Sequence, residues 1–201
     1  MLKVNKKETP KQFIHYRTKE NPKNWNDLNE NVEIKKLLRT IMLHEEQNHY
    51  CPYCEDIIEN EEKGRIEHIK PKDKFPNLMF EYTNLITSCN SFISCDQYKG
   101  NSWDENFIDP TKSDPDHFFE YNSFGEIIPI AELSELDKKK AITTIKILNL
   151  NHKSLTRSRR SYLKAMSQIQ EINLLDSFLN FPSLVKYFRK MMIPLNFGGT
   201  L

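Results

Sequence analysis

The sequence predicts a mostly helical α+β fold, in which a small β-containing core lies between an N-terminal arm and a C-terminal helical module. Three observations predict it. Apolar residues recur at helical spacing within 31–48 and again from Leu133 onward. Between these stretches, short β-type runs are interrupted by prolines and interleaved with cysteines. We expect three parts, residues 1–48, 49–130 and 131–201.

The first part is expected to be a charged arm and an amphipathic helix. Thr9 and Pro10 favour a helix start before the apolar island at 13–16, which predicts a short docking helix. The apolar stripe within 31–48 predicts the clearest helix of the N-terminal half. It consists of Ile34, Leu37, Leu38, Ile41 and Met42.

The middle part is expected to hold a β-β-α unit and a hairpin. The β-type runs are 65–69 and 84–87, and Pro71 and Pro76 separate them. Further along, Asn122-Ser123-Phe124-Gly125 predicts a turn between the apolar runs 118–121 and 127–128.

The last part is expected to be helical, with apolar stripes over 136–148 and 155–172 and a further segment after Phe181. Residues 196–201 are expected to form a loose tail. Five cations flank the second stripe, and they either contact a nucleic-acid backbone or form a solvated helix face, which is the commoner outcome. These cations are Lys153, Arg157, Arg159, Arg160 and Lys164.

Composition narrows the class of protein. The longest apolar runs fall well short of the roughly 18 residues that a membrane helix needs, so we expect a soluble, cytoplasmic protein. A net charge of +1 gives no strong overall positive field, so any contact with phosphates depends on local clusters of cations.

Four cysteines predict a structural zinc site. Cys51 and Cys54 form a CxxC pair, and Cys89 and Cys95 supply a second pair after 34 intervening residues. Together they can fill all four positions of a zinc tetrahedron, which leaves none for water activation. The alternatives are a redox pair, which lacks the usual βαβ context, and buried thiols. The five residues between Cys89 and Cys95 exceed the usual spacing, and we expect them to bulge outward.

The residues between and after the cysteine pairs suit phosphodiester hydrolysis. His68 has the intrinsic pKa of a general base, and Glu67 and Asp96 are oxygen ligands suited to Mg²⁺ or Mn²⁺. Asn84 can tie the loop that carries His68 to the second strand. Four cations are candidates for binding substrate phosphates. They are Arg65, Lys70, Lys72 and Lys99.

Neighbouring residues on a strand point to opposite faces, so Glu67 and His68 share a site only if the strand bends or ends there. Pro71 favours an early end.

The order of these motifs resembles that of the HNH (ββα-metal) endonuclease family. The motifs are the CxxC pair, Glu67-His68 before Pro71, Asn84 before an apolar strand, and Cys95-Asp96 before Lys99-Gly100. The resemblance covers residues 51–101. It implies that His68 is the general base, Asn84 the structural asparagine and Asp96 the last metal ligand. The family commonly has Asp where Glu67 stands and His or Asn where Asp96 stands, so the metal shell here is more anionic.

Within that family, the runs 66–72, 84–89 and 147–151 are most similar to the PtuB-type nuclease subunits of Septu and retron-associated antiphage systems. This implies a toxic nuclease effector that pairs with a PtuA-like ABC-type ATPase subunit and, in retron variants, with a reverse transcriptase and its DNA. The competing hypothesis is a non-catalytic zinc-stapled module that binds nucleic acid or protein. The sequence does not distinguish DNA from RNA as substrate.

Overall fold

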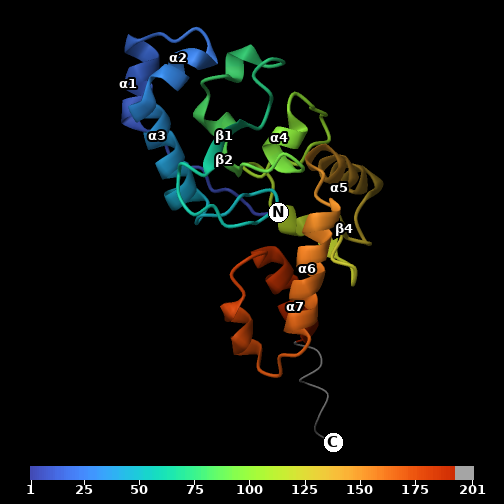
Figure 1. The fold of residues 1–201 in the computed structure, drawn as a ribbon. Coiled ribbons are helices and arrows are strands. Elements are labelled where there is room, and N and C mark those ends of the chain that lie inside the picture. Colours follow the sequence, from blue (N-terminus) through green and yellow to red (C-terminus); the bar gives the residue numbers. More distant parts are fainter. Residues whose placement is uncertain (193–201) are drawn as a thin grey trace, which may run out of the picture.

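The computed structural model describes residues 1–192, and it is a mostly helical α+β structure with two small antiparallel sheets. The helices of the N-terminal arm lie at one end, helices α6 (Lys153–Met166) and α7 (Pro182–Met192) lie at the other, and the first sheet lies between them (Figure 1). Within this range, none of the helices combines the length and apolar composition that a membrane crossing requires.

The N-terminal part contains three helices, α1 (Lys11–Lys19), α2 (Trp25–Glu30) and α3 (Val32–Thr40). Helix α2 was not expected from the sequence; its first turn is held by a capping box between Asn24 and Asp27.

The helix expected over 31–48 begins as α3 and continues as a π-helical segment, Ile41–Glu46. This segment ends at Glu46, whose side chain is buried and accepts hydrogen bonds from the Lys6 ammonium, the Lys7 amide and the Tyr82 hydroxyl. Hydrophobic spacing alone does not reveal that change of helix type, because the same face stays buried.

The first sheet pairs β1 (Gly64–His68) with β2 (Leu85–Cys89) in antiparallel register, and the short helix α4 (Cys95–Lys99) follows. Between the strands the chain forms 3₁₀ turns at Pro76–Leu78 and Tyr82–Asn84. Strand β1 ends at His68, one residue earlier than expected, and both of its last two residues are buried.

The expected hairpin is confirmed as β3 (Phe119–Tyr121) paired with β4 (Ile127–Pro129), just after a 3₁₀ turn at Pro115–His117. Its turn packs directly on α6 (Lys153–Met166). A Cβ atom added at Gly125 would lie 2.4 Å from the Thr156 carbonyl oxygen and 2.6 Å from the Arg160 amide nitrogen. Only glycine permits this approach, and its φ of +80° also favours glycine.

The C-terminal part is helical as expected, with α5 (Glu135–Leu148), α6 and α7 (Pro182–Met192). The second apolar stripe was expected to continue to 172, but α6 ends at Met166 and a 3₁₀ segment, Ile172–Ser177, follows. The tail expected at 196–201 lies outside the described residues.

Two clusters of buried side chains hold the molecule together. The larger contains all the buried cysteines together with residues of the hairpin and of α5, α6 and α7. The smaller joins α1, α2 and α3 to the start of β2 through Phe13, Leu28, Leu38 and Leu85. The larger cluster draws on both sides of position 130, and the domain limits expected at 48/49 and 130/131 stay a prediction.

Candidate functional site

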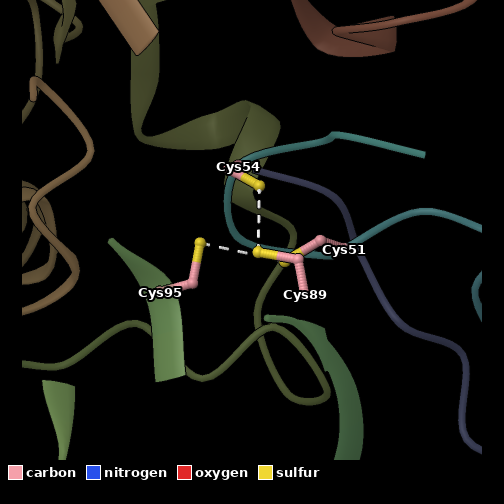
Figure 2. A group of neighbouring side chains, drawn as sticks. All are labelled: Cys51, Cys54, Cys89 and Cys95. Carbon is pink, nitrogen blue, oxygen red and sulfur yellow. Dashed lines mark hydrogen bonds between the residues drawn. The ribbon is translucent and has the colours of Figure 1, made fainter. Parts of the chain in front are cut away.

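Four cysteine sulfur atoms gather at one point, although the cysteines come from the turn before β1, the end of β2 and the start of α4 (Figure 2). The sulfur atoms all lie within 4.8 Å of one another. Cys51 and Cys95 are 3.9 Å apart and Cys54 and Cys89 3.7 Å apart, sulfur to sulfur. A tetrahedron with Zn–S bonds of about 2.3 Å has edges of roughly 3.8 Å. The cluster therefore fits a zinc ion.

The thiols also influence one another's ionisation. Burial raises the pKa of Cys51, but hydrogen bonds from the other three thiols outweigh it and hold that pKa well below its usual value. The hydrogen bond with Cys51 and burial raise the pKa of Cys54 well above its usual value. Four sulfur atoms gathered in this way form a donor set in which a dication can replace protons.

The five residues between Cys89 and Cys95 bulge outward as expected, since the Phe92 side chain is 81% exposed. Cys95 has a φ of +61°. This local bend lets Cys95 begin α4 with its sulfur turned back to the cluster.

A cleft of about 660 Å³ lies beside this cluster and is lined from α2, α3, β1 and α4. Glu67, His68 and Asp96 all line it. The end of β1 at His68 allows its last two residues to share one site, as the position of Pro71 suggested.

His68 is held in one orientation. Its Nε2 lies 2.9 Å from the Met79 carbonyl oxygen, which can only accept, so Nε2 carries the proton. Its ring meets the Trp25 ring edge-on at 4.3 Å between centroids. Within residues 1–192, Nδ1 has no hydrogen-bond partner and is not among the buried unpartnered atoms, so it reaches solvent. Burial lowers the pKa of His68 to about 4, against the opposing Met79 hydrogen bond.

Glu67 and Asp96 form the acidic part of the cleft. The Glu67 carboxylate is 2.8 Å from the Lys99 ammonium and accepts from the Tyr53 hydroxyl at 3.2 Å. Burial raises the pKa of Glu67 well above its usual value, and the neighbouring Asp96 adds to this while Lys99 opposes it. Asp96 accepts from Arg65 Nε at 3.1 Å.

Asn84 joins the loop after His68 to the start of β2. Its side-chain oxygen accepts from the Lys70 amide at 2.8 Å, and its amide donates to the carbonyl oxygens of Lys70 at 3.0 Å and Leu78 at 3.2 Å. The side-chain oxygen and the side-chain amide of Asn84 both form hydrogen bonds with the backbone. Its role as the motif's structural asparagine stays a prediction.

Of the four cations expected to bind phosphates, two line the cleft and two have other contacts. Arg65 and Lys72 line the cleft. Lys70 lies over the Phe75 and Trp103 rings instead, with its ammonium 5.3 and 5.5 Å from their centroids. Lys99 is fully buried, and its ammonium donates to the His68 carbonyl at 3.0 Å in addition to its contact with Glu67. A buried ammonium with these partners is placed to hold Glu67 and the end of β1.

Sequence reasoning missed the contribution of the arm. Trp25 from α2 and Lys35 and Arg39 from α3 line the cleft. Burial lowers the pKa of Lys35, and the nearby positive charges of Arg39 and Arg65 add to that effect. A tryptophan in an otherwise polar stretch was the available signal.

The cysteine cluster is distinct from the acidic cleft. Among the described residues, it is the one group of three or more metal-ligating side chains gathered closely enough to hold an ion. Glu67, His68 and Asp96 line the cleft and are not part of such a group.

No family model matches the chain. The chain is similar to the Septu protein PtuB of Bacillus thuringiensis, with 33% identity over 117 residues that cover 55% of this chain and 40% of that protein. It is also similar to the Septu protein PtuB of Bacillus mycoides (strain KBAB4), with 25% identity over 183 residues that cover 77% of this chain and 58% of that protein. The chain thus spans about half the length of these curated relatives.

Proposed function

We propose that this chain is a PtuB-like endonuclease of the HNH type that hydrolyses nucleic-acid phosphodiester bonds as the effector of a Septu antiphage system. The observation that carries the proposal is the cleft in which Glu67, His68 and Asp96 lie beside a group of cations. The similarity to relatives named Septu protein PtuB supports the same assignment.

In this mechanism, His68 is the general base. Its Nε2 proton is engaged by Met79, so the lone pair on Nδ1 is available to accept a proton from the attacking water. The low pKa keeps the ring neutral at pH 7, and a bound phosphate anion would raise it toward a more effective base. Trp25 and Asn84 are positioning residues, one against the ring and one on the loop that follows it.

A hard divalent cation such as Mg²⁺ or Mn²⁺ would be held by Glu67 and Asp96. The donor set suits such an ion, because two carboxylates share one cleft, and burial together with the neighbouring Asp96 raises the pKa of Glu67. When bound, the ion would supply Lewis-acid stabilisation of the phosphate and the leaving oxygen. Lys99 then acts as a positioning residue for Glu67.

Phosphates are bound by the cations that line the cleft, Lys35, Arg39, Arg65 and Lys72. Lys35 and Arg39 form no ion pair with a carboxylate inside the described range, so their charge is available to a substrate. This replaces Lys70 and Lys99 of the sequence-based expectation with two residues from the arm.

By the same resemblance, we propose a PtuA-like ABC-type ATPase as the partner subunit and a cytoplasmic location. A retron reverse transcriptase and its DNA would be partners only if the chain belongs to a retron-associated system. The zinc-stapled core is assigned to residues 49–130, with the arm, 1–48, and the helical module, 131–201, on either side.

The test compares His68→Ala with His117→Ala, an exposed histidine outside the cleft. Supercoiled plasmid and transfer RNA are incubated with each protein and Mg²⁺ or Mn²⁺. Loss of the base is expected to slow cleavage by about 10²- to 10⁴-fold while bound zinc is retained, and the control variant is expected to cleave normally. Undiminished cleavage by His68→Ala would refute the assignment.

A second candidate is a non-catalytic zinc-stapled module that binds nucleic acid or protein. It is favoured by the finding that, of the described residues, the cysteines alone form a gathered ligand group. Wild-type protein that binds the same substrates but cleaves neither with any divalent ion would establish it.

A further inference from the structure

Helix α6 presents four exposed cations on one face. Lys153, Arg157, Arg160 and Lys164 are spaced at i, i+4, i+7 and i+11, and all four are exposed. Arg159, which the sequence grouped with them, is instead buried and donates to the Leu150 carbonyl at 2.8 Å. The four exposed residues are called the α6 stripe below.

The stripe carries positive charge without local neutralisation. Helix α6 contains no Asp or Glu, and no stripe cation forms an ion pair among residues 1–192. A rise of about 1.5 Å per residue puts successive cations roughly 4.5 to 6 Å apart along the axis. This spacing is comparable to that of neighbouring phosphates in an extended strand, and the regular row suits a linear polyanion better than a single anion.

An exposed aromatic side chain, Phe124, lies beside the α6 stripe. Phe124 is 63% exposed at the hairpin tip, with the Arg160 guanidinium 5.9 Å from its ring centroid. The close packing of Gly125 on the α6 backbone holds this tip in place. The stripe also borders a groove of about 700 Å³ between the hairpin, α6 and α7, which offers the polar groups of Asn122 and Ser123. Glu120 is the one carboxylate in its described lining.

We propose that the α6 stripe and Phe124 bind a single strand of nucleic acid, with phosphates along the stripe and a base stacked on the exposed side of the Phe124 ring. Cations that follow the backbone together with an aromatic side chain are the usual means of binding single strands. The inference rests on the proposed function, since it adds a second contact surface for the same substrate. Helix α6 lies at the end of the molecule away from α2 and α3, which line the cleft (Figure 1).

The test measures binding of a fluorescein-labelled single-stranded oligonucleotide to the full chain, without added Mg²⁺ or Mn²⁺. The stripe variant is Lys153→Gln/Arg157→Gln/Lys164→Gln. The matched control is Lys11→Gln/Lys139→Gln/Lys146→Gln, which removes the same charge from exposed lysines elsewhere. The stripe variant is expected to reduce the slope of log affinity against log salt by about 2, since each single-strand contact contributes about 0.7. The control is expected to change it little.

Phe124→Ala tests the stacking step. It is expected to weaken binding by about fivefold or more on the normal strand and to have no effect on an abasic strand, which has phosphates but no bases. Melting temperatures check that all variants fold.

Three outcomes overturn the inference. They are equal slopes for the stripe and control variants, equal effects of Phe124→Ala on both strands, and competition by polyglutamate as strong as by an unlabelled strand, which would indicate an acidic protein partner. Binding is measured without cleavage, so the two proposals fail separately. Stripe-dependent binding in a protein without His68-dependent cleavage supports this inference, whereas His68-dependent cleavage with unchanged slopes overturns it.

Discussion

Lowering free zinc is expected to destabilise the fold in proportion to the logarithm of its concentration. The sulfur atoms are 3.7 and 3.9 Å apart in two hydrogen-bonded pairs, which matches a zinc tetrahedron without rearrangement. Because the ion binds the folded chain, each tenfold drop in free zinc lowers the free energy of unfolding by about 1.4 kcal/mol while free zinc stays well above the dissociation constant of the site. For a chain of this length, that corresponds to roughly 3–6 °C in melting temperature.

The assay is thermal melting, followed by circular dichroism, in a series of zinc–chelator buffers. Cys95→Ala is the matched variant, because it removes one buried ligand and its melting temperature is expected to be low and independent of zinc. Zinc content per chain should fall in parallel. Two results together would refute the metal site in favour of buried thiols. The wild-type melting temperature would not change with free zinc, and Cys95→Ala would lower the free energy of unfolding by only about 1 kcal/mol, as for a small core residue.

Three further predictions concern the cleft and the hairpin. Cleavage is expected to be insensitive to pH from neutrality down to about pH 5 and to fall below it, because protonation of His68 near its pKa of about 4 occupies the lone pair that accepts the proton; a pH–rate profile that falls between pH 8 and 7 contradicts this. Asn84→Asp is expected to lower the free energy of unfolding by about 2–4 kcal/mol in urea denaturation, since two partly buried carbonyl groups lose their donor, and a loss under about 1 kcal/mol argues against the clamp. Gly125→Ala is expected to destabilise more than Gly100→Ala, because both have positive φ but a Cβ at Gly100 meets nothing within 4 Å; equal melting temperatures would mean that the hairpin turn does not pack on α6.

A PtuB-like relationship and a four-cysteine cluster suited to zinc stand on their own. The nuclease chemistry depends on the cleft, and the variants of His68 decide it.

The sequence by itself determined the parts that rest on local pattern. The CxxC spacing predicted the cysteine cluster, helical spacing predicted α3 and α5, and the Gly-containing turn predicted the hairpin. These features are set by neighbours a few positions apart, because periodicity and turn preference act over that range.

Only the tertiary structure decided which side chains face the cleft. It brought Trp25, Lys35 and Arg39 from the arm to the cleft that His68 lines, and it buried Lys99 against Glu67 although the sequence suggested a phosphate contact. Contacts between residues tens of positions apart depend on how helices pack. A lysine in a sequence therefore carries no sign of whether its ammonium meets solvent, phosphate or a buried carboxylate.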